Sequence, residues 1–297
     1  MPDTTSVNSL RLALGTVQFG LPYGVANMLG QVSLQTAGDI VRFAANSGVD
    51  TIDTAIGYGE SEQVLGNIGV RGFNVVSKLL PLPEFVLDVE MWALREAEAS
   101  IKRLRIDGFY GLLLHRSSDL HEARGAALYE AMQKLKSEGF VRKVGISIYS
   151  PEELDSCFKK FDFDLVQAPF NLLDHRLYSS GWLDRLKAKG CEVHVRSVFL
   201  QGLLLMSLND IPPKFRQWSG IWNDWHQWLL RYNIDAVSSS LAYPLSFQQI
   251  DRVIVGVNDL EQMRQIVTAV TRSVEHQLPN LACDNEYLIN PAKWTHL

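Results

Sequence analysis

Cysteine is scarce in this sequence of 297 residues, which contains only Cys157, Cys191 and Cys283. An odd number of widely spaced cysteines fits reduced thiols better than a disulfide framework, so a cytoplasmic protein is expected. The sequence also lacks a run of about 18 apolar residues, so no membrane span is predicted. Its first residues show no charged segment followed by an apolar one, so no signal peptide is predicted.

Positive charge is not in excess, since the formal net charge is -5 and the isoelectric point is about 5.8. No long basic run is present, so nucleic acid is not expected as a partner. His115 and His121 in HRSSDLH are too isolated to indicate a metal site, and we predict none. Apolar residues are plentiful, at 46% of the chain, which is enough for a large core.

Short apolar runs alternate with longer amphipathic ones along most of the chain. The predicted strands cover residues 11–15, 49–53, 73–78, 109–115, 141–147, 163–168, 191–197 and 252–257. The predicted helices between the earlier strands cover residues 34–46, 60–68, 89–104, 122–138 and 151–158. Strands rich in Val, Ile and Leu without strict alternation indicate a parallel sheet that is buried on both faces.

A (β/α)8 barrel, an α/β fold of about 250 residues, accounts for this alternation as a single domain over residues 1–297. We expect a long insertion of loop and helix at about 202–241 and a C-terminal tail at about 275–297. An open doubly wound sheet is the alternative, but it would need a glycine-rich phosphate turn after the first strand. The corresponding stretch LGTVQFG lacks the G-x-G-x-x-G pattern, which favours the barrel.

Polar side chains follow the early strands at positions where the C-terminal ends of barrel strands converge. Asp53, Lys78 and His115 end three consecutive predicted strands, and Tyr58 lies between two glycines in the loop after Asp53. Taken singly, each has an ordinary structural interpretation. These are a turn cap for the acid, a solvated strand end for the lysine, a packed aromatic for Tyr58 and a hydrogen-bonded core side chain for the histidine. Their joint placement on one face favours a chemical site.

An ordered set of motifs from residue 12 to about residue 266 resembles the aldo-keto reductase superfamily. The set consists of LALGTVQFG, DTIDTAIGYGESEQVLG, VVSK, LLLHR, VGISIYSPEEL, LVQAPFNLLD and VIVGVNDLEQMRQI. The resemblance implies a (β/α)8 barrel and a nicotinamide cofactor, usually NADPH, bound without a Rossmann domain. It also implies a catalytic tetrad at Asp53, Tyr58, Lys78 and His115 and a small-molecule carbonyl substrate.

The chemistry of these four side chains is consistent with carbonyl reduction, in which the developing alkoxide needs a proton. A free tyrosine titrates near pH 10, and the ammonium of Lys78 would lower the pKa of Tyr58. Asp53 would keep Lys78 protonated, and a neutral His115 would donate a hydrogen bond to the substrate oxygen. Tyr58 is then the acid in reduction, and the flanking glycines let its loop direct the phenol over the barrel mouth.

The resemblance extends to positions that contact the cofactor in this family. They are Gly15, Thr16, Val17, Asp53, Ser147, Gln167, Arg196, Ser197, Phe199, Gln201, Gly202, Gly256, Val257, Asn258, Gln262 and Gln265. Ser147 and Gln167 match positions that bind the nicotinamide carboxamide, but Ile148 replaces the usual asparagine. Arg196 occupies the usual place of an aromatic ring stacked on the nicotinamide. Its planar guanidinium can stack as well, and a salt bridge with a barrel carboxylate is the alternative.

The loop after the last strand leaves the type of nicotinamide cofactor open. Asn258 and Asp259 stand where a basic residue is common beside the adenosine 2′-phosphate, although Arg264 lies nearby in the sequence. Asp259 would repel a phosphate, and the cap of the following helix is its alternative role. The resemblance predicts NADP(H), and these positions do not exclude NAD(H).

The substrate pocket is less clearly defined by the sequence. Predicted substrate contacts are Tyr23, Tyr58, His115 and Arg116. Four tryptophans between residues 218 and 228, three of them at helical spacing, fit a core stripe, with a sugar-binding wall as the alternative. The phrases FGLPYGVAN and VRSVFLQG resemble bacterial members found with surface-polysaccharide genes, which makes a sugar derivative a candidate substrate.

The sequence thus predicts an NADP(H)-dependent oxidoreductase that reduces an aldehyde or ketone by hydride transfer. A nicotinamide-binding barrel that senses redox state or binds a partner, with little turnover, is the first alternative. A phosphate-binding barrel isomerase is the second. No feature of the sequence indicates an oligomeric state.

Overall fold

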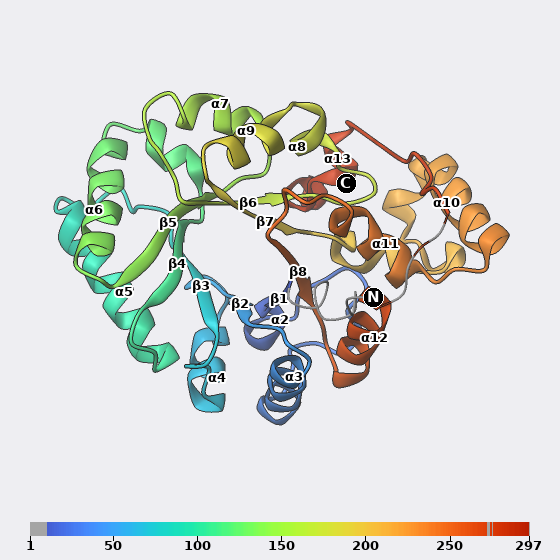
Figure 1. Cartoon of the computed structure of the whole chain (residues 1–297), viewed down its shortest axis with the longest axis horizontal. Helices are drawn as coiled ribbons and strands as arrows, with labels where there is room; N and C mark the ends of the chain where they lie inside the picture. Colours follow the sequence, from blue (N-terminus) through green and yellow to red (C-terminus); the bar gives the residue numbers. More distant parts are fainter. Residues whose placement is uncertain (1–10, 272–273, 275, 297) are drawn as a thin grey trace, which may run out of the picture.

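Eight parallel strands close into a barrel in which β1 pairs with both β2 and β8 (Figure 1). The computed structural model describes residues 11–271, 274 and 276–296. The strands are β1 (Leu12–Gly15), β2 (Thr51–Asp53), β3 (Asn74–Leu79), β4 (Phe109–Leu114), β5 (Val141–Ser147), β6 (Leu165–Pro169), β7 (Glu192–Arg196) and β8 (Arg252–Gly256). The predicted (β/α)8 barrel is confirmed.

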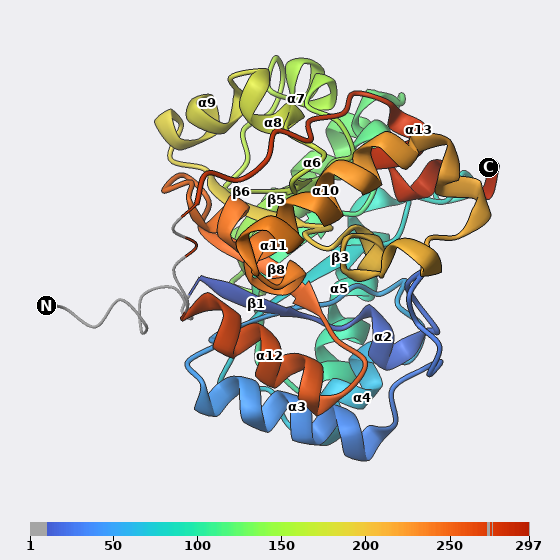
Figure 2. The ribbon, with the colours of Figure 1, turned by 90° about the vertical axis from the view of Figure 1, so that its right-hand side faces the viewer.

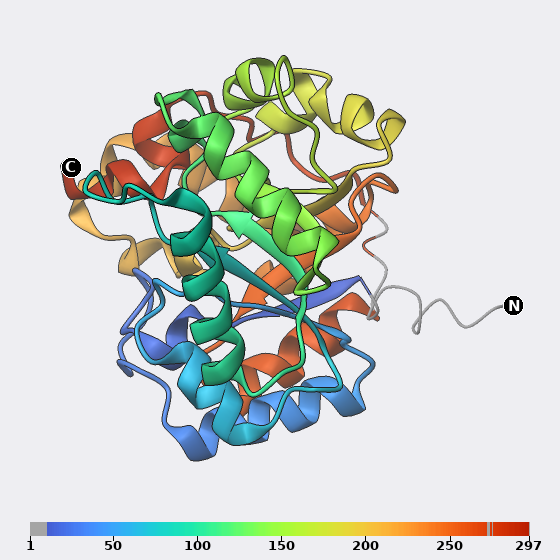
Figure 3. The same ribbon diagram turned by 90° about the vertical axis from the view of Figure 1, so that its left-hand side faces the viewer.

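Helices surround the barrel and connect successive strands. The longer ones around the barrel are α3 (Leu34–Asn46), α4 (Ser61–Ile68), α5 (Val89–Leu104), α6 (Gly125–Ser137), α7 (Glu152–Cys157), α9 (Trp182–Ala188), α11 (Ala236–Leu245) and α12 (Leu260–Val270). Short turns of helix are α2 (Val17–Gly20), α8 (Arg176–Ser179) and the 3-10 helix η1 (Ser117–His121). Figure 2 shows α3 beside α12, and Figure 3 shows α5 and α6 alongside one another.

Burial on both faces of the sheet explains why the strands show no alternating polar pattern. Every residue of β1 and of β6 is buried. Val76, Leu113 and Leu165 form a small apolar cluster of their own, while most other apolar strand residues join the continuous core with the helices. The register places Gly15 beside both Asp53 and Gly256, so the C-terminal strand ends meet on one face.

The predicted element bounds agree closely with the structure, with one instructive difference. Residues 34–46, 89–104 and 141–147 are α3, α5 and β5 as predicted. The helix predicted over residues 122–138 begins only at Gly125, after η1. A Cβ atom at Gly125 would lie 2.2 Å from the carbonyl oxygen of Leu120, so the chain folds back on itself there before α6 begins.

The predicted insertion at about 202–241 forms a separate apolar lobe beside the barrel. It contains η2 (Leu200–Leu205), η3 (Leu208–Asp210), η4 (Pro213–Trp218), α10 (Ser219–Tyr232) and the start of α11. Trp222, Trp225 and Trp228 are buried there against the C-terminal segment, which contains α13 (Glu286–Ile289) and η5 (Pro291–His296). The core interpretation is therefore confirmed for Trp222 and Trp225, whereas Trp218 of the same predicted stripe lies in η4 and is only half-buried against this lobe. Of the predicted tail, residues 275 and 297 lie outside the described residues.

The three cysteines are free thiols, and two of them are buried. Burial raises the pKa of the Cys157 thiol to about 11 and that of the Cys191 thiol to about 12, and no disulfide joins these two or Cys283. No cluster of metal-ligating side chains occurs among the described residues. Across these same residues, none of the helices is both long and apolar enough to cross a bilayer.

Glu62 links three elements, α4, β3 and α5, through hydrogen bonds to its carboxylate. Its side chain, on α4, is only 3% exposed and accepts hydrogen bonds from Ser77 on β3 and from Ser100 and Arg103 on α5, at 2.6–2.9 Å. Three donors satisfy the buried carboxylate, which would otherwise be costly to desolvate. The network therefore fixes α4 against the strand that carries Lys78.

Replacing Glu62 with alanine should lower the free energy of unfolding by about 2–4 kcal/mol, because three donors lose their acceptor. Urea unfolding followed by circular dichroism measures this difference. The matched control is Glu60→Ala, an exposed residue whose side chain makes no cap hydrogen bond, for which a change within about 0.5 kcal/mol is expected. Equal effects of the two substitutions would show that the network contributes nothing.

Candidate active site

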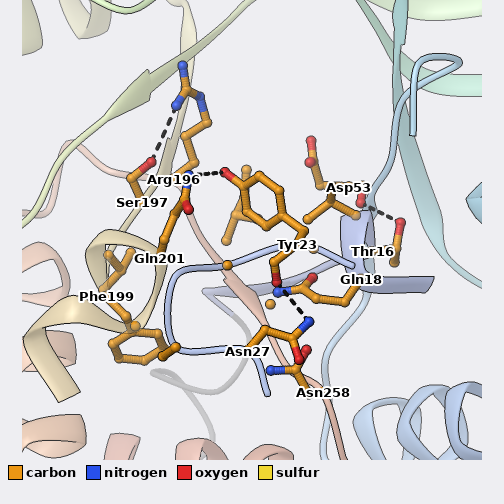
Figure 4. Close-up of a pocket in the computed structure, with 18 of the residues that line it drawn as sticks. Thr16, Gln18, Tyr23, Asn27, Asp53, Arg196, Ser197, Phe199, Gln201 and Asn258 are labelled. Atoms are coloured by element: carbon orange, nitrogen blue, oxygen red, sulfur yellow. Dashed lines mark hydrogen bonds between the residues drawn. The ribbon is translucent and has the colours of Figure 1, made fainter. Parts of the chain in front are cut away.

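A cavity of about 520 Å³ opens at the C-terminal ends of the strands (Figure 4). Most of the predicted site residues line it: Gly15, Thr16, Val17, Tyr23, Asp53, Tyr58, Lys78, His115, Ser147, Gln167, Arg196, Ser197, Phe199, Gln201, Gly202, Gly256, Asn258, Gln262 and Gln265. They come from strand ends and loops of nearly every βα unit. The cavity therefore lies where the chemistry of this fold is normally found.

A buried ion pair between Lys78 and Asp53 forms the floor of the cavity. The Lys78 ammonium donates to both carboxylate oxygens of Asp53 at 2.8 Å and to the carbonyl oxygen of Thr54 at 2.9 Å. The two side chains are only 1% and 6% exposed. Burial is the largest influence and lowers the pKa of Lys78, but the charge of Asp53, the neighbouring Tyr58 and the hydrogen bonds to both together outweigh it, so the pKa of Lys78 lies above its ordinary value. The lysine is therefore a fixed positive charge.

Tyr58 reaches the cavity because its loop lies in direct backbone contact with the turn after β1. A Cβ atom at Gly20 would lie 1.8 Å from the carbonyl oxygen of Tyr58, and one at Gly59 would lie 2.5 Å from the carbonyl oxygen of Gly20. Gly59 also has a φ of 54°, in the left-handed region that favours glycine. Two glycines thus permit the contact that positions the phenol.

The Tyr58 ring lies between Lys78 and His115. Lys78 Nζ is 5.0 Å from the ring centroid, and the rings of Tyr58 and His115 meet edge to face with centroids 5.8 Å apart and an interplanar angle of 80°. Burial raises the pKa of Tyr58 more than the charge of Lys78 lowers it. Lys78 does act in the predicted direction on the pKa of Tyr58. The predicted net lowering of that pKa is wrong, because the effect of burial is larger than the effect of the lysine. The hydroxyl therefore carries its proton at neutral pH.

His115 is neutral at physiological pH. Burial, together with the positive charges of Lys78 and Arg196, lowers its pKa from 6.5 to about 4. A neutral imidazole keeps one N–H donor and one acceptor nitrogen. The side chain can therefore donate a hydrogen bond without carrying charge, as the sequence predicts.

Unsatisfied polar atoms around the cavity test whether a nicotinamide dinucleotide fits. Gln167 Nε2 donates to Asp53 Oδ1 at 2.6 Å, but its Oε1 is buried without a partner among the described residues. The same holds for Asn258 Oδ1 and Gln18 Oε1. A Cβ atom at Gly256 would lie 2.5 Å from Gln18 Nε2, so glycine at this position leaves room for the Gln18 amide. Free acceptors at both ends fit a ligand that offers amide and hydroxyl donors.

The end of the cavity near α12 carries amides and no positive charge among its described lining residues. Asn258 donates its backbone N–H to Gln262 Oε1 at 2.8 Å, and Asp259 accepts from the backbone N–H of Gln262 as the cap of α12. The cap interpretation of Asp259 is confirmed. The Arg264 guanidinium lies 4.9 Å from the centroid of the Phe43 ring and does not line the cavity.

Two loops meet across the mouth of the cavity. Gln201 Nε2 donates to the hydroxyl of Tyr23 at 3.1 Å (Figure 4). The backbone N–H of Ala26 donates to the carbonyl oxygen of Gln201. Ser197, Leu200 and Gln201 all have positive φ values of 48–61°. Such conformations are rare for residues with a side chain and mark a strained, specifically shaped loop.

Two predicted site residues lie outside the cavity lining. The Arg116 guanidinium bonds to Asp119 and lies 3.6 Å from Glu122, because the chain turns into η1 directly after His115. Val257 is buried in the apolar core instead.

Sequence reasoning missed Gln18, Asn27 and Tyr149, which do line the cavity. All three lie in loops or short turns, where no periodic pattern signals direction. Their position in the sequence was the only signal that they could line the site, since each follows the C-terminal end of a strand within the next dozen residues or so.

The sequence profile of the Aldo/keto reductase family matches residues 11–279 of this chain. NADH-specific methylglyoxal reductase of Escherichia coli (strain K12) is 24% identical over 310 aligned residues, covering 90% of this chain and 91% of that protein. L-galactose dehydrogenase of Arabidopsis thaliana is 25% identical over 322 residues, covering 96% and 92%. The holo structure of aldo-keto reductase AKR11C1 from Bacillus halodurans superimposes with a TM-score of 0.70 at 20% identity, over 89% and 87% of the chains, and so shares the fold.

The His115 imidazole should titrate with a midpoint near pH 4 in the folded protein. Its ring proton shifts in NMR spectra, assigned by comparison with His115→Gln, measure this directly. Because the unfolded chain binds that proton near pH 6.5, this group makes the free energy of unfolding fall as the pH decreases from about 6.5 to about 4. Removing a nearby cation by Arg196→Gln should raise the midpoint, and a wild-type midpoint near 6.5 would refute the assignment.

Proposed function

The chain belongs to the aldo/keto reductase family, and on that premise we propose that it reduces an aldehyde or ketone to the alcohol with Tyr58 as the general acid. The family assigns it to the oxidoreductases that act on carbonyl compounds with a nicotinamide cofactor. The observation that carries the proposal is the convergence of one phenol, one buried ion pair and one neutral imidazole on the same cavity.

The four side chains have complementary tasks in this proposal. A reduced nicotinamide, when bound, supplies the hydride for the carbonyl carbon. Tyr58 donates its proton to the carbonyl oxygen as negative charge develops there, and Lys78 stabilises the phenolate that remains. Asp53 holds Lys78 in place and protonated. His115 donates a hydrogen bond to the same oxygen, which it can do without charge.

The unsatisfied acceptors indicate how the cofactor would be held. Gln167 Oε1, with Ser147 beside it on the cavity wall, would accept from the nicotinamide carboxamide. Asn258 Oδ1 would accept from a ribose hydroxyl at the opposite end. Ile148 is fully buried, so it offers no polar contact where the family commonly has an asparagine.

We propose NAD(H) in preference to the NADP(H) that the resemblance predicts. A 2′-phosphate needs cationic donors, yet Asn258, Gln262 and Gln265 at that end are neutral. Asp259 would add repulsion, and Arg264 is directed at Phe43. The name of the Escherichia coli relative, an NADH-specific methylglyoxal reductase, supports the same choice.

Replacing Tyr58 with phenylalanine should lower kcat for aldehyde reduction by about 10²–10⁴-fold, because the proton donor is lost while the ring remains. Absorbance of the reduced nicotinamide at saturating cofactor measures the rate, and fluorescence titration should show unchanged cofactor affinity. The matched control is Tyr178→Phe on α8, which lies outside the cavity lining and should leave kcat unaltered. Equal rates for wild type and Tyr58→Phe would contradict the acid role. Tight cofactor binding without turnover of any carbonyl would favour the redox-sensing alternative.

NADH should bind at least about tenfold more tightly than NADPH, since the latter brings a dianion to a neutral site. Fluorescence of the bound reduced nicotinamide gives both dissociation constants. Asn258→Arg should reduce the ratio of the NADPH and NADH dissociation constants. Asn223→Arg, which adds the same charge on the exposed face of α10, should leave this ratio unchanged. Tighter binding of NADPH by the wild-type protein would overturn the preference.

A further inference from the structure

The charges around the cavity do not balance. Its described lining contains three side chains that are ionised at neutral pH, namely Asp53, Lys78 and Arg196. Asp53 and Lys78 neutralise one another in their buried pair. No carboxylate of the described chain lies within ion-pair distance of Arg196, so the predicted alternative of a salt bridge is wrong. Arg196 therefore leaves the cavity with one uncompensated positive charge.

Neutral groups hold the Arg196 guanidinium in a defined position. Its NH2 nitrogen donates to the carbonyl oxygen of Ile148 at 2.9 Å, and its NH1 nitrogen donates to Ser197 Oγ at 3.3 Å. The guanidinium lies over the Tyr149 ring, with Cζ 4.6 Å from the ring centroid. These contacts orient the side chain without cancelling its charge. They also leave other N–H groups of the guanidinium without a partner in the described structure.

The charge of Arg196 acts on the end of the cavity where the chemistry is proposed. It lowers the pKa of His115, and it opposes the effect of burial on the pKa of Tyr58 and of Tyr23. No corresponding cation lines the α12 end in the described residues. Arg196 also lines the same cavity as Tyr58 and His115, so a ligand that pairs with it shares that cavity with them.

We propose that Arg196 binds an anionic group of the substrate, so that the enzyme acts on small carbonyl compounds that carry a carboxylate or phosphate. This inference rests on the function proposed above and names the substrate class. A half-buried guanidinium with unused donors matches the two oxygens of such a group. The nicotinamide would stack on the free face of the guanidinium, and the anion would bind the N–H groups along its edge. The two contacts are therefore compatible. The cofactor diphosphate is the other source of an anion, and the test separates the two.

The experiment compares 4-carboxybenzaldehyde with 4-formylbenzamide, which have similar shapes but differ by one negative charge. For wild type, kcat/KM should favour the anionic aldehyde by about 10–100-fold, as expected for a charge-assisted contact. Arg196→Gln should reduce this ratio to about 1. Arg196→Lys keeps the charge but loses the planar pair of N–H donors, so it should retain part of the preference for the anionic aldehyde. Arg116→Gln removes a charge outside the cavity lining and should preserve the ratio.

A ratio that survives Arg196→Gln, or falls in Arg116→Gln instead, would overturn the inference. A second result would also overturn it. If Arg196→Gln left the ratio of kcat/KM for the two aldehydes unchanged but bound NADH roughly tenfold more weakly, as measured by nicotinamide fluorescence, Arg196 would bind the cofactor diphosphate instead. Reduction of both aldehydes by wild type with a ratio near 1 would refute this inference alone. Reduction of neither aldehyde, at a cofactor concentration that saturates the protein, would count against the proposed function itself.

Discussion

The pairing of Lys78 with Asp53 determines the electrostatics of the whole cavity. A lone buried ammonium would lose its proton, and removing one partner from such a pair typically destabilises a protein by about 3–5 kcal/mol. With Asp53 in place, the pKa of Lys78 stays high, and its fixed charge helps to keep His115 neutral and partly offsets the effect of burial on Tyr58. Gln167 is bound to the same carboxylate. One ion pair thus sets the protonation and orientation of most of the polar groups around it.

The cavity has two ends of different chemical character, which gives any ligand a preferred direction. Arg196 and the tyrosines provide a positive, aromatic end, while Asn258, Gln262 and Gln265 provide a neutral one with amide groups. The apolar lobe of α10 and the C-terminal segment lies to one side, and its buried tryptophans pack within that lobe. The buried tryptophans therefore serve as scaffold, whereas η2 of the same lobe joins the loops at the strand ends in lining the cavity.

Most of the fold and the centre of the site could be predicted from the sequence, because strand and helix periods are local patterns. Asp53, Lys78 and His115 were identifiable since strand ends are identifiable. Loop directions carry no such period, which is why Arg116 was misplaced and Tyr149 was missed. The net pKa of Tyr58 was misjudged because it depends on how deeply the phenol is buried, and distance from Lys78 alone does not determine it.

The contact between Gly20 and the loop of Tyr58 also limits how this site can be diversified. The atoms that a Cβ would strike at residues 20 and 59 are carbonyl oxygens of the main chain, at 1.8 and 2.5 Å. No compensating side-chain change elsewhere can relieve a backbone collision, so neither glycine has an accessible second-site suppressor. A combinatorial library aimed at new substrates should hold both positions constant. Randomisation is better spent on Leu205 and Met206, which line the cavity and are not fully buried.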